Sequence, residues 1–103
     1  MYRPLPEGLT IRDSHIEGLG LFATKDFEEG FVFGRTHLFV NDVWVRTPLG
    51  GFYNHTENPN AGTEELLVQY DKRYQKEMQL RALRDIKAEE EITVTYTLYQ
   101  IGV

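Results

Sequence analysis

A chain of 103 residues is long enough to form one domain and too short to form two. Its 41% hydrophobic and 26% charged residues are ordinary for a globular protein, and no apolar run approaches the roughly 20 residues that span a bilayer, which argues against a membrane role. The 11 basic and 16 acidic residues give a net charge of −5, which argues against general nucleic-acid binding and suits a basic partner such as a lysine-bearing peptide.

The first six residues have no apolar stretch like that of a secretory signal, so we expect an intracellular protein. Beyond them, Gly, Pro and Asn separate short segments rich in β-branched and aromatic residues, a composition typical of strands. The chain is therefore predicted to be mainly β, with strands over Leu9–Arg12, Gly20–Thr24, Phe31–Phe33, Leu38–Val40, Val43–Val45, Leu66–Tyr70, Met78–Leu83 and Ile92–Leu98.

The connections between these strands differ in length. Asn41 and Asp42 suit a tight hairpin turn, and the charged residues 71–76 predict a second hairpin with a longer loop. The last strand has the clearest pattern, because its apolar residues alternate with threonines and one face points inward. Residues 74–84 come nearest to a helix, because they are good helix formers.

Two five-residue segments, 23–27 and 82–86, agree in residue type at four of five positions, and acidic residues and then a strand follow each of them. We predict the same strand–turn–strand unit twice. Asp26 and Asp85 would close the turns through side-chain to backbone hydrogen bonds, with the next, apolar residue buried. Two unrelated β-turns could also share this chemistry.

The first segment that could carry chemistry contains Gly18, Leu19 and Gly20, ahead of an apolar strand. Glycines at this spacing allow positive φ and let the backbone approach a ligand closely. The same pattern is typical of a simple hairpin turn. It is not a dinucleotide fingerprint, because the third glycine is missing and no long helix follows.

The second segment, residues 50–60, crowds asparagine, histidine, aromatic and turn-forming residues together. Such crowding is costly unless the backbone is held in an irregular path with its polar groups satisfied. Asn54 can donate and accept hydrogen bonds, so it could hold the amine and carboxylate ends of an amino-acid-like ligand, although Asn–His pairs are commonly structural. A metal site at His55 is not predicted, because the chain has no cysteine and no histidine at metal-ligand spacing.

The third segment, residues 89–96, ends in Tyr96, and Tyr99 follows closely. An aromatic residue on the inward face of a strand is commonly part of the core. A functional role for Tyr96 therefore depends on the order and spacing of all three segments.

In that order and spacing the chain resembles the SET-domain lysine methyltransferases. Their pattern runs from Gly-x-Gly, through Asn-His-Ser/Thr-x-x-Pro-Asn, to Glu-Glu-Leu/Ile-Thr-x-x-Tyr, and residues 18–20, 54–60 and 90–96 match it in that order. The resemblance extends from about Leu9 to Tyr96, and the chain resembles especially the very short virus-encoded members. It implies a single SET domain over residues 1–103, with a β-clip fold of several small sheets. It also implies a C-terminal pseudoknot, in which one segment is threaded against another, an arrangement that is rare in proteins.

The resemblance also implies an activity, which is transfer of a methyl group from S-adenosylmethionine to a lysine of a histone tail or another protein, with S-adenosylhomocysteine as product. The cofactor-binding residues implied are Gly18, Leu19, Gly20, Asn54 and His55. Tyr96 is implied to be the catalytic tyrosine at the inner mouth of a narrow lysine channel. The channel walls are expected from Phe52, Tyr53, Val94 and Tyr99, although core packing would explain each of these equally well.

The chain also departs from the family pattern. With no cysteine it can have neither the pre-SET nor the post-SET zinc module, and no metal is expected. Only residues 97–103 follow Tyr96, so the outer channel wall must come from Tyr99, Ile101, a second subunit or the bound peptide, and we expect a homodimer. Val94 stands where many members have Phe or Tyr, so the number of methyl groups added is left open.

The sequence is compatible with two other functions. A catalytically inactive SET-like module could bind peptide or cofactor without turnover. A metal-dependent or hydrolytic enzyme would use His55 with Glu57 or Glu64, but it lacks a nucleophile with an evident base and orienting group.

Overall fold

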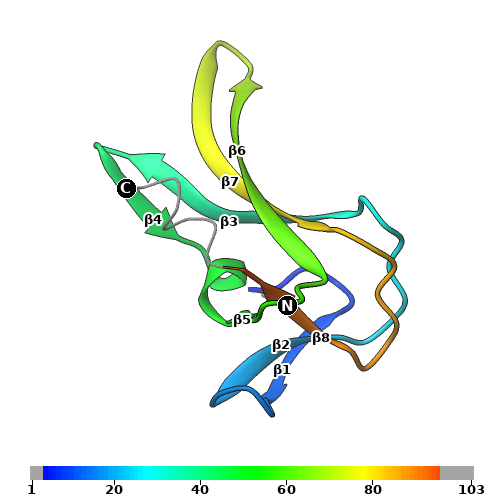
Figure 1. Cartoon of the computed structure of the whole chain (residues 1–103). Coiled ribbons are helices and arrows are strands. Elements are labelled where there is room, and N and C mark those ends of the chain that lie inside the picture. Colours follow the sequence, from blue (N-terminus) through cyan, green and yellow to red (C-terminus); the bar gives the residue numbers. More distant parts are fainter. Residues whose placement is uncertain (1–3, 96–103) are drawn as a thin grey trace.

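The computed structural model describes residues 4–95, so Tyr96, Tyr99 and the rest of the last predicted strand lie outside the described residues. Within 4–95 the chain forms eight strands and one short 3₁₀ helix, η1 (Pro48–Gly51), and the strands make two four-stranded sheets (Figure 1). The predicted mainly β class is confirmed. None of the helices in this range is long and apolar enough to cross a membrane.

The first sheet has the strand order β1-β2-β8-β5. Its members are β1 (Leu9–Asp13), β2 (Leu19–Ala23), β5 (Asn54–His55) and β8 (Glu91–Val94). β8 lies between β2, which runs antiparallel to it, and β5, which runs parallel to it. Since β8 comes from the C-terminal part of the chain, it joins segments that are far apart in sequence. This is the described part of the expected pseudoknot.

The second sheet has the order β4-β3-β7-β6, and its long β6–β7 hairpin extends away from the first sheet (Figure 1). Its strands are β3 (Val32–Val40), β4 (Val43–Arg46), β6 (Ala61–Tyr70) and β7 (Arg73–Ala82). The predicted hairpin turn at Asn41 and Asp42 is confirmed, with φ of 49° and 65°. The two short strands predicted between 31 and 40 are one strand, interrupted by bulges.

The longer loop predicted over residues 71–76 is wrong. Pairing between β6 and β7 continues to Tyr70 and Arg73, so the turn contains only Asp71 and Lys72, and Asp71 has a φ of 54°. No helix forms over 74–84, because pairing to β3 and β6 on both sides decides the conformation of β7 against local helix propensity.

The hydrophobic core draws on both sheets and on the turns between them. Leu21 and Ile92 of the first sheet and Leu80 of the second are fully buried. The rings of Phe27 and Phe33 lie 4.8 Å apart in an edge-to-face arrangement, a favourable geometry for aromatic pairs. One continuous core therefore holds the two sheets together.

The repeated segments do form matching turns. Phe27 and Ile86 exchange two backbone hydrogen bonds, of 2.7 and 2.9 Å, and both side chains are buried. The aspartates accept backbone hydrogen bonds as predicted, but each closes the other unit's turn. Asp26 and Asp85 each bind the N–H three residues after the other aspartate, at 2.9 and 2.8 Å. The two units therefore interlock about a local pseudo-twofold axis.

Gly30 and Glu89 occupy equivalent positions in these units, with φ of 89° and 78°, and their N–H groups both donate at 2.8 Å to an alanine carbonyl, of Ala82 and Ala23. A Cβ on Gly30 would meet nothing within 4 Å, so only its backbone conformation opposes a side chain. We expect Gly30→Ala to lower the free energy of unfolding by about 1 kcal/mol. Glu89→Gly should leave it within about 0.5 kcal/mol of the wild type, because relief of the positive φ is offset by the entropy cost of glycine and by loss of the exposed ion pair with Arg12 at 3.1 Å. Urea unfolding measures both, and a destabilisation by Glu89→Gly as large as that by Gly30→Ala would contradict the equivalence.

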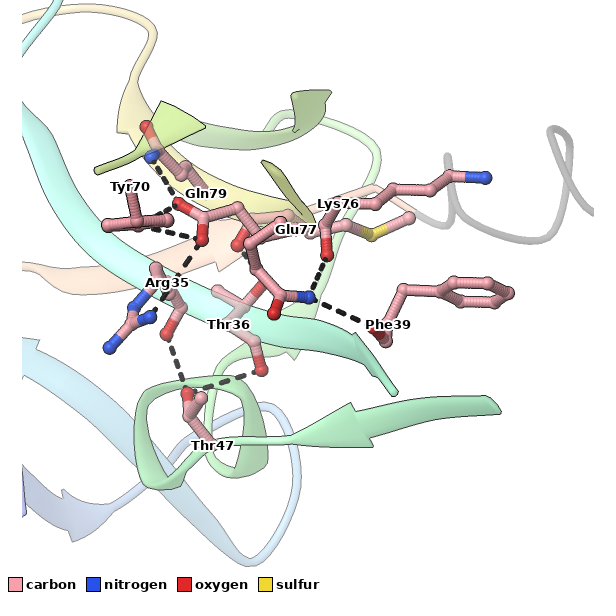
Figure 2. Close-up of polar contacts among 10 residues, drawn as sticks. Arg35, Thr36, Phe39, Thr47, Tyr70, Lys76, Glu77 and Gln79 are labelled. Atoms are coloured by element: carbon pink, nitrogen blue, oxygen red, sulfur yellow. Dashed lines mark hydrogen bonds and ion pairs between the residues drawn. The ribbon is translucent and has the colours of Figure 1, made fainter. Parts of the chain in front are cut away.

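A buried carboxylate ties three strands of the second sheet together. Glu77 of β7 is fully buried, and it accepts hydrogen bonds from the Tyr70 hydroxyl at 2.9 Å and the Gln79 amide at 2.9 Å, with an Arg35 nitrogen 3.8 Å away (Figure 2). Burial and the hydrogen bond to Glu77 raise the pKa of Tyr70. Because a buried carboxylate is costly without such partners, the cluster holds β3, β6 and β7 in register.

Candidate functional site

The three segments singled out in the sequence meet at β8. On one side Leu21 of β2 pairs with Ile92, and on the other side Asn54 of β5 pairs with Thr93. The N–H of Thr56 extends the second contact by donating to the Val94 carbonyl at 2.8 Å. The two-residue strand β5 was not predicted, since its polar, aromatic-flanked sequence has no alternating pattern.

Asn54 connects the glycine-containing turn to β8. Its side-chain nitrogen donates to the carbonyls of Glu17 and Leu19, at 3.2 and 3.1 Å, and to the Glu91 carboxylate at 2.8 Å. The nitrogen that was expected to hold an amino-acid-like ligand is therefore engaged with protein acceptors. For a ligand at this place, Asn54 offers its side-chain oxygen, since its backbone pairs with β8.

The two glycines of this turn have different surroundings. Gly18 has a φ of 46°, and a Cβ there would meet nothing within 4 Å, so the backbone is open on that side. At Gly20 a Cβ would overlap the carboxylate of Glu91. The expected close approach therefore occurs at Gly20, but the group that approaches is a protein side chain. Gly18 and the half-exposed Leu19 form the open part of the turn.

Glu91 and Asn60 are site residues that the sequence analysis did not single out. The Ser14 hydroxyl donates to both oxygens of Glu91, at 2.8 and 2.9 Å. Asn60, which is 2% exposed, donates to the Glu91 carbonyl at 2.8 Å and accepts from the Thr93 N–H at 2.9 Å. Both residues lie inside the matched motifs, so their positions were visible. Their hydrogen-bond partners are up to 77 residues away in sequence and could not be identified from the motifs.

The expected channel residues lie close to the core. Val94 is buried, and Phe52 and Tyr53 pack partly buried against the same core cluster. The Tyr53 and His55 rings meet edge to face, with centroids 5.8 Å apart. The fourth channel residue, Tyr99, lies outside the described residues, as does the expected catalytic residue Tyr96.

Two surface clefts occur in the described part of the chain. One, of about 380 Å³, is bordered by residues 4–6, Gly34, Arg35 and residues 47–49, and the other, of about 220 Å³, by residues 62–64, Arg81 and Leu83. Neither is lined by an expected cofactor or channel residue. The candidate site is defined by the junction of β2, β5 and β8, where the three segments meet. Between residues 4 and 95 no group of three or more His, Asp or Glu side chains is placed to hold a metal ion.

The histidines of the fold should make its stability sensitive to acid. Burial lowers the pKa of His55, and burial together with the Arg46 charge lowers the pKa of His37. Since both unfolded-state pKa values are about 6.5, the unfolded chain binds more protons below that pH. The free energy of unfolding should be level above about pH 7.5 and fall as the pH drops through 6.5. Chemical unfolding from pH 5 to 8 measures this dependence. If the free energy of unfolding of a variant carrying His37→Gln and His55→Gln fell with pH as steeply as that of the wild type, the prediction would be contradicted.

The comparisons with known proteins agree with this geometry. A family model described as the SET domain matches residues 39–97, more than half of the chain. The fold is similar to a solved structure of a candidate histone methyltransferase from Plasmodium falciparum, with a TM-score of 0.71 and 20% identity over 85% of this chain and 96% of that one. No curated protein sequence matches the chain.

A second similar structure is that of Polycomb Repressive Complex 2 from Chaetomium thermophilum, in an autoinhibited conformation bound to S-adenosylmethionine. The TM-score is 0.70 and the identity 19%, over 94% of this chain. The chain spans only 17% of that much longer protein. At these identities the likeness concerns the fold, and it agrees with the SET-domain match.

Proposed function

Since the chain belongs to the SET-domain family, we propose that it is a protein-lysine methyltransferase that uses S-adenosylmethionine. The observation that carries the proposal is the junction at β8, the strand that precedes Tyr96. There β2, which follows the glycine-containing turn, pairs on one side and Asn54–His55 on the other, and the Asn54 side chain donates to the Leu19 carbonyl of the turn. Segments that carry the family's motifs thus meet from distant parts of the sequence, which supports the proposal.

The open turn fits the cofactor assignment. A backbone at positive φ with free space beside Gly18, next to the half-exposed side chain of Leu19, can receive a ligand lying along it. Gly18, Leu19 and Gly20, with Asn54 and His55, would hold S-adenosylmethionine there. When bound, that cofactor supplies an electrophilic methyl group on a sulfonium. Burial lowers the pKa of His55, so its ring would add little positive charge near pH 7 to a site that holds a cationic cofactor.

The chemical problem for the protein is the protonation of its substrate. A lysine of pKa about 10.4 must lose a proton before it can react, at a cost of about 4.6 kcal/mol at pH 7. A dry channel reduces this cost, because desolvation and a nearby cation both disfavour the ammonium form. Tyr96 would orient the amine by hydrogen bonding, so that positioning supplies most of the rate. Phe52 and Tyr53 would guide the cationic side chain by cation–π attraction.

The substrate is proposed to be a histone tail or another basic protein, in keeping with the net charge of −5. We also propose an intracellular location and a homodimer in which the second subunit helps to close the lysine channel. Sedimentation of the purified protein tests the dimer, and a monomer at working concentrations would contradict it.

Methyl-labelled S-adenosylmethionine, offered with core histones, ribosomal proteins and lysine-rich peptides, tests the activity. Mass spectrometry should locate label on a lysine, and Tyr96→Phe should lose most of it. Tyr74→Phe is the matched control, because Tyr74 is an exposed tyrosine of β7, and it should keep full activity. Absence of label together with binding of S-adenosylhomocysteine in calorimetry would favour an inactive SET-like module. Absence of both would overturn the proposed function.

A further inference from the structure

The Glu91 carboxylate is the point where the three segments of the candidate site are joined. Its two oxygens share the single hydroxyl proton of Ser14, which precedes the glycine-containing turn, and it accepts one hydrogen bond from Asn54 on β5. It also packs directly against the backbone at Gly20. A carboxylate only accepts hydrogen bonds, so two donors from different segments can be held on it together.

The same two donors also shape the turn itself. The Ser14 hydroxyl accepts the N–H of Ile16 at 2.9 Å, and the Ser14 N–H donates to the Gly18 carbonyl at 2.8 Å. Asn54 donates to the carbonyls of Glu17 and Leu19. The turn over residues 14–19 is thus closed by Ser14 from one side and by Asn54 from the other, and both side chains are fixed by Glu91.

We propose that Glu91 is a positioning residue that holds the turn at 14–20 and the Asn54 side chain in the arrangement that binds the cofactor. This inference rests on the proposed function, because it assigns the turn a cofactor to bind. Glu91 acts through Ser14 and Asn54 and does not itself contact the cofactor. Its loss should weaken cofactor binding far more than it slows the chemical step.

The variant Glu91→Gln tests this with little change of shape. One oxygen becomes an NH₂ group, which would face the Ser14 hydroxyl or the Asn54 amide as a second donor. We expect S-adenosylhomocysteine to bind tenfold or more weakly in calorimetry, and kcat at saturating cofactor to stay within about threefold of the wild type. Glu90→Gln is the matched control, because the Glu90 side chain binds Arg84 at 3.3 Å and the Lys87 N–H at 2.8 Å instead of Ser14 and Asn54, and cofactor affinity should be unchanged.

A second pair of measurements separates positioning from folding. Ser14→Ala should also weaken binding, and combining it with Glu91→Gln should add little, because both remove the same link. Hydrogen exchange at the N–H of Ile16 should become faster in both variants, with no cofactor present. Unchanged affinity and unchanged exchange in folded Glu91→Gln would overturn the inference. If the wild type fails to bind S-adenosylhomocysteine, the proposed function falls and the cofactor part of the inference with it, while exchange still decides whether Glu91 holds the turn.

Discussion

Replacing Gly50 by alanine should destabilise the protein by about 3 kcal/mol, whereas the same change at Gly51 should stay within about 0.5 kcal/mol. Gly50 is buried in η1, and a Cβ there would overlap the Thr36 carbonyl oxygen and lie 3.0 Å from the side chain of Arg46. That carbonyl already accepts the Thr47 N–H at 2.9 Å. The added methyl must therefore push backbone away and strain a buried hydrogen bond, and no flexible side chain can yield instead.

Gly51 is the internal control for this effect. It is exposed, and a Cβ there would meet nothing within 4 Å. Urea unfolding of the two alanine variants isolates the contact from the general effect of removing a glycine, since both positions lie in the same short helix. Equal stability of the two variants would mean that Thr36 and η1 are not packed together as described.

Local patterns predicted the elements whose conformation depends on neighbouring residues. Alternation and β-branched composition located β1, β2 and β4 to within a residue or two, and Asn41–Asp42 determined the tight turn because both residues tolerate positive φ. The β6–β7 hairpin was predicted, but its loop was predicted too long because charged residues resemble a loop. The continued pairing of Arg73 to Tyr70 comes from the partner strand and not from the segment itself.

In the candidate site, too, the sequence predicted what depends on local residues and missed what depends on distant segments. The motifs identified which segments should meet, and the structure brings the 18–20 turn and Asn54–His55 together on β8. What the sequence could not give is the partner of each polar side chain. Asn54 was expected to bind a ligand through its amide, and its nitrogen binds two carbonyls and Glu91 instead. Such partners are set by the three-dimensional path of distant segments.

Asn60 provides the second large effect, because it joins the middle segment to β8 through backbone atoms. We expect Asn60→Asp to lower the free energy of unfolding by about 3–5 kcal/mol at pH 7, the range for an uncompensated buried charge. The side chain is 2% exposed, and the group that now donates to the Glu91 carbonyl would become a second acceptor. Asn58→Asp, at an exposed position two residues earlier, is the matched control and should change stability by less than about 0.5 kcal/mol.

The pH dependence of this variant would distinguish a buried charge from a simple loss of packing. Burial raises the pKa of a carboxyl group, so the introduced aspartate should be protonated in the folded state over a range where it is ionised in the unfolded state. The loss in free energy of unfolding caused by this aspartate is then largest at neutral pH and becomes smaller as the pH falls toward the unfolded-state pKa of about 3.9. At lower pH the protonated carboxyl can again donate to the Glu91 carbonyl. The free energies of unfolding of Asn60→Asp and Asn58→Asp should therefore differ less at pH 5 than at pH 7. A constant difference would mean that the Asn60 side chain is not held between the Glu91 carbonyl and the Thr93 N–H, and that β8 is positioned by its neighbouring strands alone.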